Sequence, residues 1–453
     1  FHISTGDDYV VLVGDDTPYH LQGTIPRDQL ATWDAMTGTT WGNPFYKYTS
    51  HRYDPDLDIW EGDHKGTLNA VYELLYDCGV RWYYPGEIGE VIPQKSTITI
   101  PAQYRNVEPD FAMRNQLIYY ADYGIASDDI LYWQLRQRFN RYEQNLGTNL
   151  GHGMNPFLER AEMRAAHPEY YAVFNGQRQN GAQYKPNLCS PLLFEEHLNY
   201  IRFMFDTYPD MPAIAISPVD AFHHVSKEEP RCEPTIQPER GHNGWLSDHV
   251  WEYMNNIAWE AYKEYPEKKV IGLAYYNYLL PPEDLSKPLA PNIVLVIARW
   301  FGPYRYTENQ FYIADGPYPY TDNQDYYRAI TEDWLELLPS QELYLWEYYL
   351  FNADYKDTER IPAVYPHLIA EEFAFLKGKS QGQFIETYYL QKPGMEARGV
   401  DWDVFAANSL NVWVTARLFW DADQNVDELL DEFYELFYGP ASTQMKAFFE
   451  YAE

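Results

Sequence analysis

The stretch AIAISPVDAFHH, from Ala213 to His224, decides how the rest of the chain is interpreted. Its first four residues are small or β-branched and lie between Pro212 and Pro218, which predicts a short strand buried on both faces. The carboxylate of Asp220 and two imidazoles follow directly. In a barrel of parallel strands, catalytic groups lie just beyond the C-terminal ends of the strands. We therefore expect a catalytic acid at Asp220, with a capping aspartate in a surface loop as the structural alternative.

Strand and helix patterns alternate from Phe111 onwards, as in parallel α/β sheets. The predicted strands are Met113–Tyr119, Gln144–Leu150, Tyr170–Phe174, Pro212–Ser217, Lys269–Tyr276, Ile293–Ala298, Glu342–Trp346 and Gln383–Glu386. The predicted helices are Glu195–Thr207, Leu246–Glu264, Tyr326–Leu338, Val364–Lys377, Asn408–Trp420 and Val426–Phe437. About eight strands over this length predict a closed (β/α)8 barrel rather than an open doubly wound sheet. No glycine-rich nucleotide-binding motif follows any of these strands, which counts against a Rossmann fold.

The regions on either side of the barrel differ from it. Residues 1–106 combine short strand patterns with one amphipathic helix, predicted at Lys65–Tyr76, which indicates a small α+β domain. The barrel is expected at residues 107–400, and a C-terminal helical segment packed on it at residues 401–453. Because the first residues enter a strand directly, we expect an upstream portion with a secretion signal, and a secreted or periplasmic protein.

The charge of the chain excludes several classes of partner. It holds 67 acidic and 34 basic residues, a formal net charge of −33, which repels phosphate backbones and anionic lipid surfaces. We therefore expect no nucleic acid partner. No run of about 18 apolar residues is present, so no membrane insertion is expected. Homo-oligomerisation stays open.

Aromatic and cysteine content add two further indications. Aromatic residues make up 17% of the chain, more than packing normally requires. Rings that stack on sugar faces are one explanation, and an aromatic-rich core is the other. The three cysteines are widely spaced and odd in number, which predicts neither a disulfide framework nor a zinc ribbon.

Several segments resemble the bacterial proteins that carry the DUF4838 domain. They are HKGTLNAVYELLYDCGVRWYYPGE at His64–Glu87, HPEYYAVFNGQR at His167–Arg178, NLCSP at Asn187–Pro191, LYLWEYYLF at Leu343–Phe351, ARLFWDAD at Ala416–Asp423 and YGPAS at Tyr438–Ser442. The family is similar in layout to α-glucuronidases of family 67 and to family 20 hexosaminidases. This resemblance covers nearly the whole chain. It implies an exo-acting glycoside hydrolase without an organic cofactor.

One loop departs from the family pattern. Where relatives often read SQNDGGGYCECxxC, this chain reads SPVDAFHHVSKEEPRC, which keeps Ser217 and Asp220 but only Cys232 of the cysteines. The side chains of His223, His224 and Cys232 are possible ligands by type, but their spacing is irregular, so we expect no metal site. We expect His223 to contact the substrate.

Three carboxylates at predicted strand ends are candidates for catalysis: Asp220, Glu347 in LWEYY and Glu386 in FIETYY. Glycoside hydrolysis needs two carboxyl groups that flank the scissile bond, and aromatic neighbours can raise the pKa of such a group by desolvation. The resemblance implies that Asp220 is the general acid, because the fourth strand carries the acid in the resembled hydrolases. Glu347 is the first choice for base or nucleophile and Glu386 the second. Turn capping, or an ion pair between Glu347 and Arg299, is the structural alternative.

Further side chains are predicted to contact the substrate. Arg114 on the first strand matches an arginine that related barrel hydrolases place on a sugar hydroxyl or carboxylate. Together with Arg299 at the end of the sixth strand it suits an anionic sugar, because guanidinium groups bind carboxylate or sulfate with two hydrogen bonds. His152 lies between glycines in LGHGMN, where the backbone can approach a ligand. Structural ion pairs and hydrogen bonds are the alternatives for these three. The remaining candidates are Tyr275, Asn277, Trp300 and Trp346.

These patterns together predict an exo-acting glycoside hydrolase of an acidic or decorated polysaccharide or glycan. A non-catalytic carbohydrate-binding protein on a hydrolase-like barrel is one alternative, because fold does not fix function. A polysaccharide lyase that uses His152 and a tyrosine as base and acid is another. Lyase products are unsaturated and absorb in the ultraviolet, whereas hydrolysis products are saturated and do not absorb there.

Overall fold

The computed structural model describes residues 1–17, 53–54, 59–60, 64–118, 128–140, 146, 150–209, 211–220, 222, 225, 228, 236–299, 316–318, 323–348, 364–387 and 402–453. The chain divides into two compact units. The first contains Phe1–Tyr19, His51–Gln144 and Glu347–Glu453, and the second contains His20–Ser50 and Asn145–Trp346. Both units are discontinuous in sequence, whereas three consecutive domains were expected. The expected boundaries near residues 106 and 400 stay predictions.

The second unit is built on parallel strands. They are β11 (Ala213–Ala215), β12 (Lys269–Ala274), β13 (Ile293–Ala298) and β14 (Leu343–Glu347). In this order, each strand pairs in parallel with the next. Every residue of β13 is buried, as its continuous apolar sequence IVLVIA requires for a strand covered on both faces.

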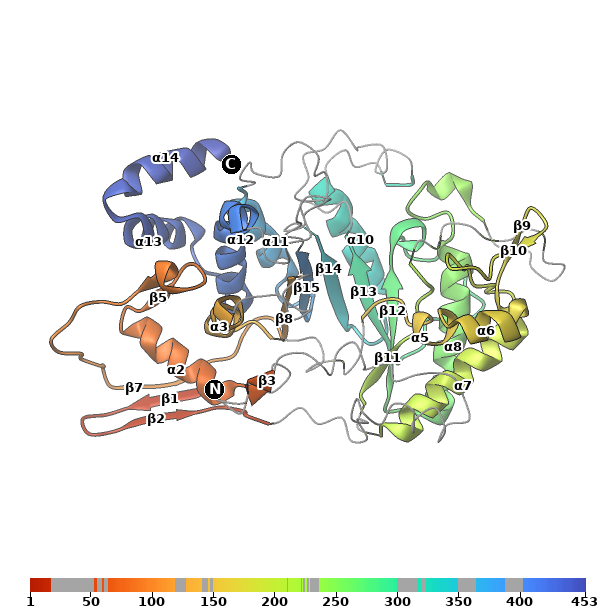
Figure 1. Cartoon of the computed structure of the whole chain (residues 1–453), viewed down its shortest axis with the longest axis horizontal. Helices are drawn as coiled ribbons and strands as arrows, with labels where there is room; N and C mark the ends of the chain where they lie inside the picture. Colours follow the sequence, from red (N-terminus) through yellow and green to blue (C-terminus); the bar gives the residue numbers. More distant parts are fainter. Residues whose placement is uncertain are drawn as a thin grey trace. The chain divides into compact units, whose positions relative to one another are not determined.

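Helices of the second unit lie beside these strands (Figure 1). They are α7 (Pro191–Thr207), α8 (Ser247–Glu264) and α10 (Asn323–Leu337). α7 begins where the Ser190 hydroxyl accepts a hydrogen bond from the Leu193 N–H, with proline at the first helical position. The buried rings of Trp251 and Trp334 join α8 to α10 with centroids 4.5 Å apart. The short helices α5 (Asn155–Leu158) and α6 (Ala161–Ala166) precede α7 in the chain.

The first unit contains an antiparallel sheet of three strands in the order β2-β1-β7. These are β1 (His2–Thr5), β2 (Val10–Val13) and β7 (Gln103–Asn106). Between β2 and β7 in the chain come β3 (Tyr53–Asp54), β4 (Ile59–Trp60), α2 (Gly66–Asp77), β5 (Arg81–Trp82) and β6 (Glu90–Val91). This part of the unit mixes strands with one helix, and the expected separate α+β domain at residues 1–106 stays a prediction.

The rest of the first unit is mostly helical. It holds β8 (Met113–Ile118), α3 (Asp128–Arg136), α11 (Pro366–Leu376), β15 (Gly382–Thr387), α12 (Trp402–Trp420), α13 (Val426–Tyr438) and α14 (Ser442–Ala452). β15 pairs in parallel with β8 along its whole length. None of the described helices is both long and apolar enough to cross a membrane.

The expectation of a closed (β/α)8 barrel is wrong. The described residues form a parallel sheet of six strands in the order β11-β12-β13-β14-β15-β8, with α-helices between strands. Within the described residues, β11 and β8 stand at the two ends of this order, and no strand pairs both of them to close a barrel. Over the described residues, the fold is therefore a mixed α/β fold with a parallel sheet of six strands that does not close.

Two of the eight expected strands account for the difference. The segment predicted at Tyr170–Phe174 contains a 3₁₀ turn at Pro168–Tyr170 and then β9 (Val173–Phe174), which pairs antiparallel with β10 (Gln177–Arg178). Asn175 and Gly176 between them have φ of 50° and 72°, the combination that a type I′ hairpin needs. The sequence signal was present, because Asn-Gly is typical of the two-residue turns of such hairpins. In the other segment, Gln144–Leu150, the described residues Leu146 and Leu150 lie in a helix and a bend.

The cysteines also differ from expectation. Cys189 is disulfide-bonded, whereas Cys78 is a free thiol. Cys232, the third cysteine of the sequence, lies outside the described residues. An odd cysteine count therefore did not exclude a disulfide, because one free thiol accounts for the odd number.

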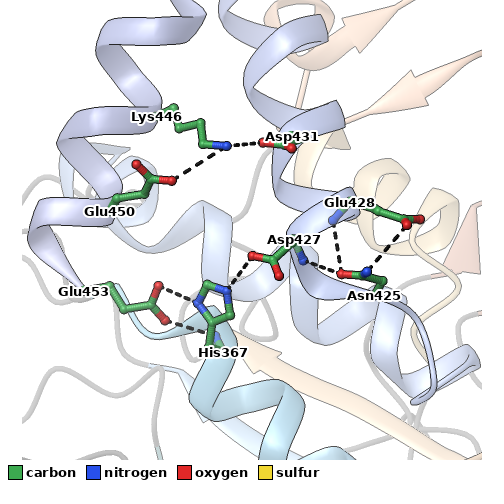
Figure 2. Close-up of polar contacts among 8 residues, drawn as sticks. All are labelled: His367, Asn425, Asp427, Glu428, Asp431, Lys446, Glu450 and Glu453. Atoms are coloured by element: carbon green, nitrogen blue, oxygen red, sulfur yellow. Dashed lines mark hydrogen bonds and ion pairs between the residues drawn. The ribbon is translucent and has the colours of Figure 1, made fainter.

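His367 connects three C-terminal helices of the first unit (Figure 2). It lies in the first turn of α11, and its Nδ1 is 2.8 Å from an oxygen of Glu453, which follows α14. Its Nε2 is 3.2 Å from Asp427 in the first turn of α13. Nearby, Lys446 of α14 forms ion pairs with Asp431 and Glu450. Because both ring nitrogens of His367 face carboxylate oxygens, which only accept, the two contacts favour the imidazolium form, in which each nitrogen carries a hydrogen.

Replacing His367 with glutamine should therefore destabilise the protein in a pH-dependent way. Burial lowers the pKa of His367, but its hydrogen bonds to Glu453 and Asp427 outweigh burial and raise the pKa overall. The stabilisation is complete below the unfolded-state pKa near 6.5 and is lost as the pH rises through the folded-state pKa. Since the ring is half exposed, we expect a loss of about 0.5 kcal/mol at pH 6 and less at pH 9.

Urea denaturation of the parent and the His367→Gln variant at both pH values measures this difference. Lys446→Met is the matched control, because its ammonium group joins α14 to α13 yet stays charged over the same range. An equal loss at both pH values in His367→Gln would show that the ring acts by packing alone.

Candidate functional site

The site is built where β11 of the second unit ends. His152 lies in a loop held against this strand end by the backbone of the next two residues. A Cβ atom on Gly153 would lie only 1.9 Å from the carbonyl oxygen of Ala215, so the position accepts only glycine. The Met154 N–H then donates to the carbonyl oxygen of Ser217 at 3.2 Å. Gly153 therefore lets the loop approach the strand rather than a ligand.

His152 is fixed in one tautomer by its surroundings. Its Nδ1 is 2.8 Å from the carbonyl oxygen of Pro218, which only accepts, so Nδ1 carries the hydrogen. Its Nε2 lies 3.7 Å from Oδ1 of Asp220. Burial lowers the pKa of His152, although the charge of Asp220 and the bond to Pro218 act in the opposite direction. At neutral pH the ring is therefore neutral, and Nε2 presents a lone pair towards Asp220.

Tyr275 completes a cluster of three side chains. It follows β12 directly, and its hydroxyl donates to Oδ1 of Asp220 at 3.4 Å. Its ring lies edge-on to that of His152, with centroids 5.9 Å apart. The next residue, Tyr276, has a φ of 49°, which is unusual for a residue with a side chain and often marks functional sites. We call His152, Asp220 and Tyr275 the Asp220 cluster.

The charge of Asp220 shifts the pKa values of two further residues, Lys185 and Tyr278, which sequence reasoning missed. Lys185 is half-buried; burial lowers its pKa, and the charge of Asp220 opposes that shift. Tyr278 is fully buried, and burial together with the charges of Tyr275 and Asp220 raises its pKa well above the ordinary value. Tyr278 was within reach of sequence reasoning, since it follows β12. Lys185 was not, because QYKPN carries no strand-end pattern.

Three other predicted substrate contacts belong to the second unit: Asn277, Arg299 and Trp346. Asn277 lies in the 3₁₀ turn Tyr276–Tyr278 and is 1% exposed. Arg299 directly follows β13; its side chain is fully buried, and its N–H donates to the carbonyl oxygen of Trp346 in β14 at 2.9 Å. These positions follow strands as predicted, and their contact with a substrate stays a prediction. His223 and Trp300 lie outside the described residues.

The other two predicted catalytic carboxylates belong to the first unit. Glu347 is the last residue of β14 and is fully buried, and Glu386, 5% exposed, is the next-to-last residue of β15. β14 and β15 are neighbours in the sheet. Two buried carboxyl groups therefore lie at the C-terminal ends of adjacent strands. Whether they act with Asp220 stays a prediction.

Arg114, on β8 of the first unit, is engaged by the backbone around it. Its Nη1 donates to the carbonyl oxygens of Phe111 and Ala112, and its Nε donates to that of Arg138. Burial, followed by the charge of Arg138, lowers the pKa of Arg114 to about 9. Arg114 is 7% exposed, and with these backbone partners it holds loops in place. We therefore leave Arg114 out of the site proposed below.

In the described part of the chain, no group of three or more His, Cys, Asp or Glu side chains has an arrangement that could hold a metal ion.

Comparison with known proteins gives one match. Residues 84–450 match the family described as "Domain of unknown function (DUF4838)". No curated protein matches the chain. The family part of the expected resemblance is thus confirmed, and the similarity to α-glucuronidases and family 20 hexosaminidases stays a prediction.

Proposed function

Because the chain belongs to the DUF4838 family, whose function is unknown, we propose a function from the chemistry of its site: glycoside hydrolysis on an acidic or decorated glycan, with Asp220 as proton donor. The observation that carries this proposal is the Asp220 cluster. It joins a carboxyl group, a neutral imidazole and a phenol at the C-terminal ends of neighbouring parallel strands. Active sites of parallel α/β sheets typically lie there.

Asp220 and His152 are neighbours in the cluster, with Nε2 and Oδ1 3.7 Å apart. Burial disfavours the imidazolium form of His152, so the imidazole holds a proton less strongly than an exposed histidine does. The side chain of Asp220 is 66% exposed and is open to the oxygen of a leaving sugar. Glu347 or Glu386 would then serve as base or nucleophile.

A polysaccharide lyase is the second candidate, favoured by one observation. The lone pair on Nε2 of His152 lies in the same cluster as the hydroxyl group of Tyr275. In β-elimination, such a base removes the proton next to the carboxylate of a uronic acid, and a tyrosine protonates the leaving oxygen. The half-buried ammonium group of Lys185 near Asp220 would favour an acidic substrate in either reaction.

A secreted or periplasmic location belongs to the same proposal. The disulfide at Cys189 supports it, because disulfides persist mainly in oxidising compartments. A polysaccharide-degrading enzyme is also expected where its substrate is found.

Incubating the protein with a panel of acidic and neutral glycans tests the proposal, with product masses and ultraviolet absorbance as readouts. We expect products heavier by one water and without ultraviolet absorbance. Unsaturated products without added water would establish the lyase instead. Saccharide binding without turnover on any substrate would contradict both and favour a non-catalytic carbohydrate-binding protein.

A further inference from the structure

The first unit holds a cavity of about 340 Å³, within the size range of sites for small ligands. Its wall comes from α2, β7 and the segment after it, the end of α3, and α12 with the turn that follows. The residues that line it are Glu73, Arg105, Asn106, Val107, Glu108, Asp110, Arg138, Arg417, Trp420, Asp421 and Gln424. Three guanidinium groups in one wall are unusual in a chain with a net charge of −33.

The three arginines share this wall with four carboxylates, those of Glu73, Glu108, Asp110 and Asp421, and Arg105 also pairs with Asp77. Glu73 bridges two arginines, with oxygens 3.2 Å from Arg105 and 2.6 Å from Arg138. Arg417 donates to the side-chain oxygen of Gln424 at 3.1 Å and lies over the ring of Tyr76, but it forms no ion pair with any described carboxylate. Burial lowers the pKa of Arg138 to about 10 despite Glu73, and the charge of Arg417 acts in the same direction. Arg138 and Arg417 therefore repel each other across the cavity wall.

Within the described residues, the other three acidic residues of the wall form no ion pair with its arginines. Asp110 is engaged, because one of its oxygens is 2.8 Å from Nζ of Lys377 and accepts from the Ala422 N–H at the same distance. Glu108 and Asp421 are exposed to solvent, where their charge is screened. Together with the amides of Asn106 and Gln424 they offer acceptors for hydroxyl groups.

Three hydrogen-bond donors of the residues that line the cavity are unpaired within the described part of the chain. Nε of Arg105, Nε of Arg417 and Nε1 of Trp420 are buried and have no hydrogen-bond partner among the described residues. Trp420 is 7% exposed, and its ring lies under the guanidinium of Arg138, with 4.3 Å from Cζ to the ring centroid. Buried donors normally have partners, because leaving one unsatisfied costs about 1–3 kcal/mol.

We propose that this cavity binds a small hydroxylated acid, such as a sugar acid. Its carboxylate would lie against Arg417 and Trp420, since a carboxylate accepts hydrogen bonds from guanidinium and indole groups together. Its hydroxyl groups would donate to the carboxylates and amides at the exposed edge. This site is separate from the Asp220 cluster in sequence and chemistry.

Isothermal titration calorimetry with galacturonate, galactose and inorganic sulfate tests the site. We expect saturable binding of galacturonate and binding of galactose at least 10-fold weaker. Arg417→Met should weaken galacturonate binding at least about 10-fold, because a lost charge-assisted hydrogen bond costs about 1.5–3 kcal/mol. Trp420→Phe, which removes only the indole N–H donor, should weaken it less. Circular dichroism verifies that both variants are folded.

Two matched variants locate the binding. Arg202→Met removes a surface arginine of α7 that pairs with Glu264 and should leave galacturonate binding unchanged. Lys185→Met removes the ammonium group that would favour an acidic substrate at the Asp220 cluster and should also leave galacturonate binding unchanged, which separates this site from the proposed active site. Galacturonate binding lost in Lys185→Met but kept in Arg417→Met would overturn the proposal, as would no binding of any probe. Binding of sulfate alone would overturn the sugar-acid assignment.

Discussion

Asparagine in place of Asp220 is expected to lower the turnover number of the parent protein at least about 100-fold, the contribution that a positioned general acid typically makes. The change keeps the shape of the side chain and its acceptor for the Tyr275 hydroxyl, and it removes the negative charge and the ability to hold and release a proton. The Michaelis constant should change little, because ground-state contacts remain. Steady-state kinetics on the best substrate of the glycan panel measures both constants.

Glu267→Gln is the matched control. Glu267 is an exposed carboxylate of the second unit near the start of β12, so this variant removes the same charge far along the chain from the cluster. We expect parental rates from it. Asp220→Asn protein that keeps more than about a tenth of the parental turnover would remove Asp220 from the role of general acid. Parental turnover together with a raised Michaelis constant would assign Asp220 to binding instead.

Local patterns predicted the individual elements well where burial is complete. β13 matches the prediction Ile293–Ala298 residue for residue, because six consecutive apolar residues fit a strand buried on both faces. α13 begins at the predicted Val426, where Asn425 accepts hydrogen bonds from the first N–H groups of the helix. Such signals lie within a few residues of each other and are therefore readable from sequence.

Closure of the sheet is not a local property. It depends on hydrogen bonds between strands that are far apart in the sequence, and six parallel strands carry the same apolar pattern whether the sheet is open or closed. Counting the Tyr170–Phe174 segment as a barrel strand gave apolar residues priority over the Asn175-Gly176 turn. That turn favours an antiparallel hairpin, so these residues pair with each other and not with the strands of a parallel sheet.

In the candidate site too, local patterns were readable from the sequence, whereas contacts between distant segments were not. His152, Asp220 and Tyr275 were each predicted from their places at strand ends or between glycines, and the structure brings the three together. The reason for the glycine after His152 was not readable, because it depends on the distance from Gly153 to the backbone of β11. Lys185 was missed for the same reason, since only the folded chain places it near Asp220.

Glutamine in place of Glu432 is expected to lower the free energy of unfolding by about 3 kcal/mol, as removal of one partner of a largely buried ion pair does. Glu432 on α13 accepts from Nε and Nη2 of Arg81 at 2.8 and 2.7 Å, a two-pronged contact with β5. Its Oε1 also accepts from the hydroxyls of Tyr83 at 3.0 Å and Tyr76 at 3.3 Å. Glutamine leaves the guanidinium of Arg81, which is 11% exposed, without its counter-ion.

The pH dependence of this loss identifies its cause. Burial raises the pKa of Glu432, but the hydrogen bond and charge of Arg81, with the two tyrosines, outweigh burial and lower the pKa overall. The stabilisation is therefore present above the unfolded-state pKa near 4.5 and is lost as the pH falls through the folded-state pKa. Urea denaturation of the parent and the variant should give stabilities that converge as the pH falls below the folded-state pKa of Glu432, because the carboxylate then takes up its proton.

Glu435→Gln, one turn further along α13 on an exposed position, controls for the change of charge on the helix and should cost less than about 0.5 kcal/mol. A double-mutant cycle with Arg81→Met isolates the pair itself. We expect a large coupling energy, because each single variant already breaks the same two hydrogen bonds. Equal losses in Glu432→Gln and Glu435→Gln would mean that packing of aromatic rings, such as Tyr83 on Phe433 at 5.1 Å, holds α13 in place without the ion pair.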